Sequence, residues 1–250
     1  MKNLPLLSAL LVLGSLSAPA SAFAQSTNFT IAQRGHPVGT ASFNFSPAPN
    51  GRLFTSQVHI SMQGLNYALS NSEELFPSGH LRHAQISATV NGSAVNLSAR
   101  LDSAQYLLNI SANGRAATTR LEFHPAAILL PDFDPGALQA LLDLSNSPSA
   151  ARSDLWAILP KQYTADDGST QPASIQPIQL ATYRDEQGTL DGKPILVHHL
   201  IVTIASSQTE LFSGPDNQLL QAELPQQGFA LVRDGFVLTP PARPIAPPAD

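Results

Sequence analysis

The sequence of 250 residues contains no cysteine and little charge. Without cysteine, disulfides, zinc–thiolate sites, iron–sulfur clusters and cysteine nucleophiles are excluded. Asp, Glu, Lys and Arg make up 12% of the chain, against about 25% in a typical soluble domain. The 13 basic residues are scattered among 18 acidic ones. Because binding to a phosphate backbone needs a concentrated basic face, no nucleic-acid partner is predicted.

Motifs of known chemistry are also missing. The chain has no Gly-x-Ser-x-Gly, Ser-x-x-Lys or His-Glu-x-x-His sequence. The glycines of Gly35–Gly39 open a strand pattern rather than a helix, so they do not form a phosphate loop. One tryptophan and four tyrosines offer little stacking surface for a sugar substrate. The sequence therefore predicts no catalytic, cofactor-binding or metal-binding residue and no cofactor.

Histidines and paired carboxylates are the remaining candidates for a metal site or for acid–base chemistry. His80 and His83, and likewise His198 and His199, have spacings that place the two members on opposite faces of a strand. This spacing argues against a metal site, and His59, His80 and His83 are predicted to be surface or rim residues. The paired carboxylates are Glu73-Glu74, Asp132 with Asp134, Asp166-Asp167 and Asp185-Glu186. The last two pairs are expected in solvated turns, and Asp134 is expected to cap a helix.

The N-terminus has the pattern of a secretory signal peptide. A short positive start precedes the apolar run Leu4–Leu16, and small residues continue to Ala24. We expect cleavage after Ala24 and a periplasmic or extracellular location. Since a membrane-spanning helix needs about 20 apolar residues, no transmembrane helix is predicted after removal of the signal.

Most of the remaining chain alternates apolar and polar residues, which indicates strands. Asn91-Gly92 and Asn113-Gly114 each separate two alternating runs and predict type I′ hairpins. Asp134-Pro135 followed by helically spaced leucines predicts one short helix over about 134–146. Further predictions are a bulge or close approach at Gly39, a strand over Asp154–Pro160 and a polar loop over Thr164–Pro172.

These patterns predict a mainly β protein, built as a curved antiparallel sheet or half-closed barrel with one short helix. The predicted organisation is a signal peptide (1–24), a single β-rich domain (25–239) and a proline-rich disordered tail (240–250).

Three stretches of the sequence, taken together, resemble those of a known class of proteins. They are the Gly-x-x-x-Gly-Thr strand in 34–45, Leu-Trp-Ala-Ile-Leu-Pro in 155–160, and the late hairpin in 209–234. The chain resembles exported bacterial β-rich proteins of unknown function, whose domains also precede secreted α/β-hydrolases. This resemblance implies a curved sheet around one core and an accessory role. Phe212 and Ser213 stand where that family usually carries tryptophan and aspartate, and no catalytic residues come with the resemblance.

The function expected from the sequence is that of a non-catalytic exported envelope protein. It would bind an apolar or amphipathic, lipid-like molecule, or dock an envelope protein; the sequence does not identify the ligand-binding residues. One alternative is a secreted hydrolase with a His/Asp/Ser site that motifs do not reveal. A second alternative is an outer-membrane barrel, which alternating strands and low charge would fit.

Overall fold

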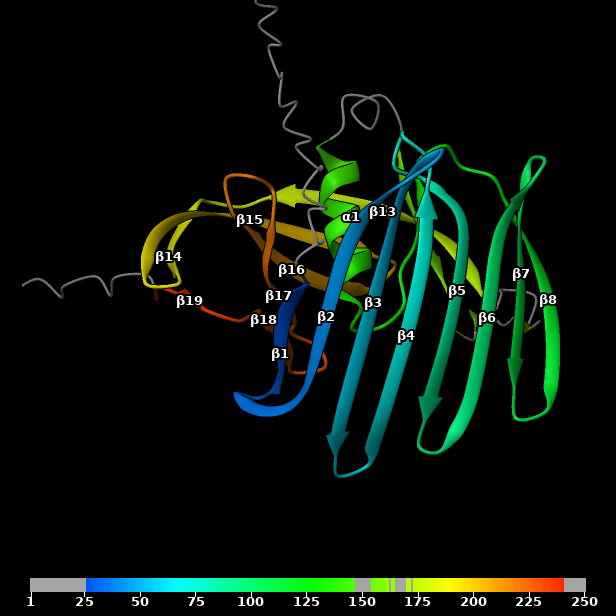
Figure 1. Ribbon diagram of the computed structural model, residues 1–250, viewed down its shortest axis with the longest axis horizontal. Coiled ribbons are helices and arrows are strands. Elements are labelled where there is room, and N and C mark those ends of the chain that lie inside the picture. Colours follow the sequence, from blue (N-terminus) through cyan, green and yellow to red (C-terminus); the bar gives the residue numbers. More distant parts are fainter. Residues whose placement is uncertain (1–25, 147–153, 162, 165–169, 172, 241–250) are drawn as a thin grey trace, which may run out of the picture.

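The computed structural model describes residues 26–146, 154–161, 163–164, 170–171 and 173–240 (Figure 1). The predicted signal peptide 1–24 lies outside the described residues. So do most of the predicted Thr164–Pro172 loop and nearly all of the predicted tail. The described chain is mainly β with one short helix, which confirms the predicted fold class. No helix in these described ranges is long and apolar enough to cross a membrane.

The first half of the chain is an antiparallel meander in which each strand pairs with the next. Its strands are β1 (Thr27–Gln33), β2 (His36–Ala48), β3 (Gly51–Met62), β4 (Leu65–Leu75), β5 (Leu81–Val90), β6 (Ser93–Asp102), β7 (Gln105–Ala112) and β8 (Arg115–Glu122). Asn91 and Gly92 both have positive φ, 48° and 84°, and so do Asn113 and Gly114, 51° and 73°. The two predicted hairpin turns are therefore confirmed.

The second half adds the short strand β9 (Ala127–Leu129), the helix α1 (Pro135–Ser145) and further strands. These strands are β10 (Leu155–Leu159), β11 (Tyr163–Thr164), β12 (Thr170–Gln171), β13 (Ser174–Thr182), β14 (Glu186–Leu190), β15 (Lys193–Ile204), β16 (Ser207–Ser213), β17 (Leu219–Leu224), β18 (Phe229–Arg233) and β19 (Phe236–Leu238). The predicted strand over Asp154–Pro160 is confirmed as β10, while β11 and β12 pair only with each other.

One continuous sheet joins the two halves, because β1 pairs with β2 on one side and with β18 on the other. From β18 the pairing continues through β17, β16, β15, β13 and β10 to β9, and β10 with β9 is the parallel pair. The sheet is curved and does not close: its described ladders end at β8, which pairs with β7, and at β9, which pairs with β10, while β14 and β19 form a branch from β15. In Figure 1 the meander forms the front layer, β13 and β15–β17 lie behind it, and β14 projects to the left.

Close backbone contact explains Gly39, where a bulge or tight approach is predicted. The register between β1 and β2 shifts after Ile31, the residue opposite Gly39. A Cβ at Gly39 would collide with the carbonyl oxygen of His59 on β3. Only glycine fits where the strands approach this closely, so both parts of the prediction hold.

The helix α1 lies between the two layers of the sheet (Figure 1). Asp134 caps it as predicted, since its Oδ1 accepts hydrogen bonds from the backbone N–H groups of Gly136 (2.8 Å) and Ala137 (3.2 Å). A Cβ at Gly136 would lie 2.7 Å from Cδ2 of Phe54, so the first turn of the helix rests directly on β3.

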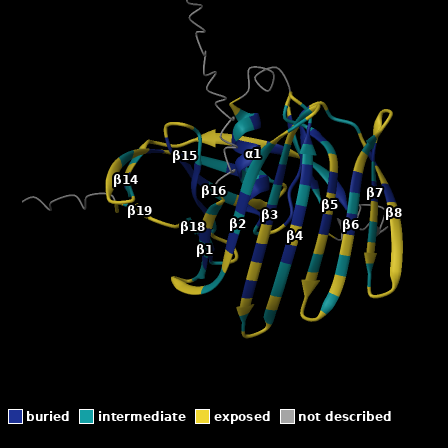
Figure 2. Ribbon diagram, viewed as in Figure 1, coloured by how far each residue is buried: buried dark blue, intermediate teal, exposed yellow. Residues whose placement is uncertain are grey.

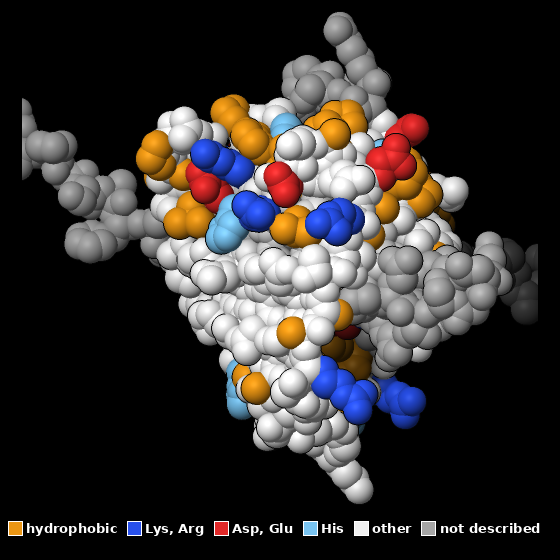
Figure 3. Space-filling model, turned by 90° about the vertical axis from the view of Figure 1, so that its right-hand side faces the viewer, with side chains coloured by type: hydrophobic (Ala, Val, Ile, Leu, Met, Phe, Trp, Pro, Cys, Tyr) orange, Lys and Arg blue, Asp and Glu red, His pale blue; other side chains and the backbone are white. Residues whose placement is uncertain are grey.

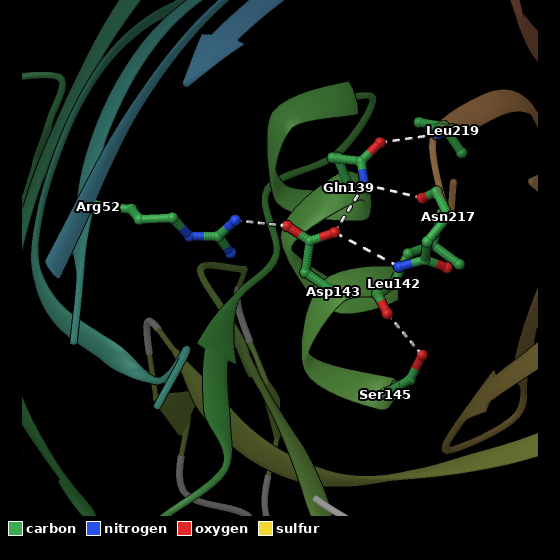
Figure 4. Close-up of polar contacts among 7 residues, drawn as sticks. All are labelled: Arg52, Gln139, Leu142, Asp143, Ser145, Asn217 and Leu219. Carbon is green, nitrogen blue, oxygen red and sulfur yellow. Dashed lines mark hydrogen bonds and ion pairs between the residues drawn. The ribbon is translucent and has the colours of Figure 1, made fainter. Parts of the chain in front are cut away.

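Polar contacts hold α1 to both layers (Figure 4). Gln139 is buried; its Oε1 accepts from the backbone N–H of Leu219 (2.7 Å) and its Nε2 donates to the carbonyl of Asn217 (3.0 Å). On the meander side, Arg52 of β3 forms an ion pair with Asp143 at 2.8 Å. Because each layer contributes a partner, the helix is fixed in place as part of the core.

The alternating pattern decides which side chains are buried. Phe54, Val58 and Ile60 of β3 are buried as one face, and Figure 2 shows the alternation along the meander strands. The main core fills the space between the layers around α1. A second, smaller cluster lies on the opposite face of the rear layer, since the neighbours Leu211 and Phe212 of β16 belong to different clusters.

Candidate functional site

Two apolar cavities flank the segment that leads from β9 into α1, the β9–α1 linker (Leu130–Asp134). The first, which we call the meander cavity, has a volume of about 180 Å³. Apolar side chains from the inner face of β4–β7 form most of its wall. The lining residues are Tyr67, Leu69, Ile86, Ala88, Val90, Val95, Leu97, Ile110, Leu130, Pro131, Asp132, Pro160 and Lys161. The second, the helix cavity, has about 160 Å³ and lies between the linker, α1 and the rear layer.

The two cavities share part of their wall. Leu130, Pro131, Asp132 and Lys161 line both. Lys161 Nζ and Asp132 Oδ1 form an ion pair at 2.9 Å, and both side chains are about half exposed. The hydroxyl of Tyr67 donates to the carbonyl oxygen of Asp132 at 3.2 Å. Burial raises the pKa of Tyr67, with Asp132 and Asp134 adding to the effect, so the phenol keeps its proton and remains a donor. Each cavity is thus apolar with a polar rim.

A larger groove of about 710 Å³ lies on the outward face of the meander and has a different character. Hydroxyl and amide side chains line it, and neighbouring strands exchange hydrogen bonds such as Gln57 to Ser70 (2.8 Å) and Ser87 to Asn96 (3.0 Å). Figure 3 shows a similar scarcity of charge on one side of the molecule, where a broad uncharged stretch separates two groups of charged side chains. Such a polar face is expected to be hydrated rather than to bind an apolar ligand.

A buried acidic cluster lies at the end of the linker. Glu73, Asn71 and Ser56 from the inner face of β4 and β3, and Asp134 at the start of α1, are each at most 1% exposed. The Nδ2 group of Asn71 donates to Oε1 of Glu73 and to Oδ2 of Asp134, both at 2.7 Å. One amide therefore joins two buried carboxyl groups.

Burial raises the pKa of both carboxyl groups. For Glu73 the rise is large; the neighbouring Asp134 adds to it and the hydrogen bond from Asn71 opposes it. For Asp134, the hydrogen bonds from Asn71 and from the helix N-terminus oppose the effect of burial. Oε2 of Glu73 and Oδ1 of Asn71 have no hydrogen-bond partner within the described structure. Unpaired buried oxygens are uncommon in folded proteins.

This cluster makes stability depend on pH. Since the folded chain holds these protons more tightly than the unfolded chain, the resulting stabilisation is complete below the unfolded pKa values of 4.5 and 3.8. It is lost as the pH rises through the raised, folded values. We therefore expect Glu73→Gln to stabilise the protein relative to the parent chain by an amount that grows as the pH rises above the unfolded pKa of 4.5.

Urea denaturation at a series of pH values, followed by circular dichroism, measures this difference. The matched control is Glu74→Gln, because Glu74 is the next residue on the strand, is partly exposed and pairs with Arg82 at 2.7 Å. Parallel pH profiles for Glu73→Gln and the parent chain would contradict the prediction.

The predicted orientation of His198 and His199 is confirmed, whereas His80 precedes β5 and so does not share a strand with His83. His198 and His199 are on opposite faces of β15, with side chains 46% and 8% exposed. His59 and His83 are exposed and His80 is half-buried, which confirms their surface or rim positions. Burial lowers the pKa of His80.

Two of these histidines contact carboxylates. His198 Nδ1 lies 2.9 Å from Asp185, while the ring nitrogens of His199 lie 3.2 Å from Glu186 and 3.1 Å from Glu210. Among the described residues, no histidine is hydrogen-bonded to both a carboxylate and a hydroxyl, which a hydrolytic triad would need. Nor do His, Asp and Glu side chains in this part of the chain form a group of three suited to a metal ion.

No family model, curated protein or solved structure matches this chain. The geometry of the cavities and of the buried cluster is therefore what bears on function.

Neither the meander cavity nor the buried cluster is predicted from the sequence. Glu73 and Glu74 appear there as one carboxylate pair, although Glu73 is fully buried and the Glu74 side chain is 28% exposed. The available signal is the alternation of β4, in which Leu69, Glu73 and Leu75 share the inward face. For the meander cavity no local signal exists, because its wall combines β4–β7 with Pro131 and Pro160.

Proposed function

We propose that this chain is a binding protein of the bacterial cell envelope, which holds the apolar part of an amphipathic small molecule in the meander cavity. The observation that carries the proposal is an apolar cavity with a Lys161–Asp132 pair at its rim. An apolar protein cavity of about 150 Å³ stays dry and binds benzene. The meander cavity therefore has room for one ring or a short alkyl chain, with the polar end of the ligand at the rim.

Several sequence-based expectations support this proposal and stay predictions themselves. The envelope location rests on the signal-peptide pattern of residues 1–24, and the accessory role rests on the resemblance to exported β-rich proteins. Binding is favoured over hydrolysis, because the histidines in contact with carboxylates have no hydroxyl from the described part of the chain bound to the same ring. Binding to a small molecule is favoured over docking of an envelope protein, because the cavity is concave and apolar.

Filling the cavity tests the proposal. Ala88 lines the meander cavity, whereas the next residue, Thr89, is exposed on the opposite face of β5. We expect Ala88→Phe to weaken binding of 1-octanol, a neutral probe with one polar end, by at least tenfold, because the ring occupies the space of the alkyl chain. Isothermal titration calorimetry on the mature chain measures the affinity.

Thr89→Phe is the matched control and should bind 1-octanol as the parent chain does. Circular dichroism confirms that both variants are folded. Absence of binding to the parent chain, or an equal loss in the two variants, would contradict the proposal.

A further inference from the structure

The β9–α1 linker connects the two features described above. At one end Leu130, Pro131 and Asp132 form the shared wall of both cavities. At the other end Asp134 lies in the buried cluster, where it caps α1 and accepts a hydrogen bond from Asn71. Phe133, the one residue between Asp134 and Asp132, also lines the helix cavity, so Asp134 is directly continuous with the shared wall.

We propose that the Glu73–Asn71–Asp134 cluster is a proton-operated latch on the β9–α1 linker, and that it couples ligand binding in the meander cavity to pH. This inference rests on the proposed function. When Glu73 is protonated, the Asn71 amide holds Glu73 and Asp134 together and the linker is docked. When Glu73 releases its proton to solvent, a second negative charge is placed beside Asp134, and the linker is pushed away from β4.

The surroundings of Glu73 leave this repulsion uncompensated. Across the sheet its register partners are Phe54 on β3 and Ala84 on β5, which carry no charge. From the helix side the charged group that acts on it is Asp134. Arg52, Arg82 and Lys161 are each paired with a different carboxylate: Arg52 with Asp143 on α1, Arg82 with Glu74 on the outward face, and Lys161 with Asp132 at the cavity rim. In this low-dielectric site two carboxylates cannot both ionise without a large penalty.

The coupling has a definite sign. The docked linker completes the cavity wall, so the protonated state binds the ligand more tightly and affinity falls as the pH rises. By linkage, ligand binding in the range where Glu73 titrates is accompanied by proton uptake. The ligand would be held at lower pH and released at higher pH.

The test uses the mature chain and 1-octanol, which does not itself titrate. We expect its affinity for the parent chain to fall by at least tenfold between pH 5.5 and pH 9, and its affinity for Glu73→Gln to stay constant. Glu74→Gln serves as the control and should behave as the parent chain. A flat pH profile for the parent chain, or the same slope in Glu73→Gln, would overturn the latch.

A second measurement needs no ligand and separates the latch from the proposed function. Hydrogen exchange of the Gly136 and Ala137 amides, which Asp134 caps, reports whether the start of α1 is docked. At pH 9 these amides should exchange at least tenfold faster in the parent chain than in Glu73→Gln, and at pH 5.5 the two chains should be equal.

If exchange follows this pattern and no octanol binds at any pH, the binding function fails and the proton-operated docking stands. Equal exchange at pH 9 overturns the latch whatever the ligand result.

Discussion

Replacing Asn71 with leucine is expected to lower the free energy of unfolding at pH 7 by about 3 kcal/mol or more, because two hydrogen bonds to carboxyl groups of about 1.5–3 kcal/mol each are lost. The Asn71 amide is the shared donor to Glu73 and Asp134, and all three residues are buried. Leucine fills a similar volume and donates nothing, so two buried carboxyl groups lose a hydrogen bond at once. Losing a bond to a charged group is more costly than losing one between neutral groups. Urea denaturation monitored by circular dichroism measures the change.

The pH dependence of this loss distinguishes the cluster from ordinary packing. At pH 4.5 more of both carboxyl groups is protonated, so the loss in Asn71→Leu should be clearly smaller than at pH 7. Asn109→Leu is the control, because Asn109 is exposed on the outward face of β7 and its replacement should change stability by less than about 0.5 kcal/mol. A loss that does not vary with pH would show that the amide does not act through the two carboxyl groups.

Phe54→Ala is expected to cost about 3–5 kcal/mol, the usual range for removing a buried aromatic ring. Phe54 is fully buried, its ring packs against Phe45 at 5.4 Å between centroids, and the first turn of α1 rests on it at Gly136. The fixed contacts of Gln139 and Asp143 hold the helix in place, so it cannot move to fill the space. Thermal and urea unfolding measure the effect.

Leu53→Ala is the control on the same strand, since Leu53 is half-buried on the opposite face. Its replacement should cost clearly less. A loss below 2 kcal/mol in Phe54→Ala would mean that the helix does settle into the vacated space, which would contradict the anchored helix described above.

Features set by neighbouring residues could be predicted from the sequence. The turns at Asn91-Gly92 and Asn113-Gly114 need positive φ at both positions, and that requirement is local. The helix over 135–145 is likewise predicted by local residues, since Asp134 is its N-cap and Pro135 its first residue. Even the opposite orientation of His198 and His199 follows from the period of a strand.

Features made by distant segments could not be predicted in this way. The pairing of β1 with β18 and the parallel pair of β9 with β10 have no sequence signature, and the meander cavity depends on both layers. The burial of Glu73 is an intermediate case. Its strand position places it on the inward face, but ionisable residues are rarely buried without a partner. The partners of Glu73, Asn71 and Asp134, are known only from the structure.

The pairing of β1 with β18 sets an order of events during synthesis and folding. Thr30 and Asp234, which are hydrogen-bonded in the finished sheet, are 204 residues apart in the chain. The hairpins of β2–β8 involve near neighbours and can form as soon as that part of the chain is free, whereas long-range pairing is slow because loop closure must come first. Until β18 is present, β1 has one unpaired edge, which is a template for pairing with another chain. Pairing with β18 therefore covers the free edge of β1. A chain shortened before Phe229 would leave this edge unpaired and prone to pair with another chain.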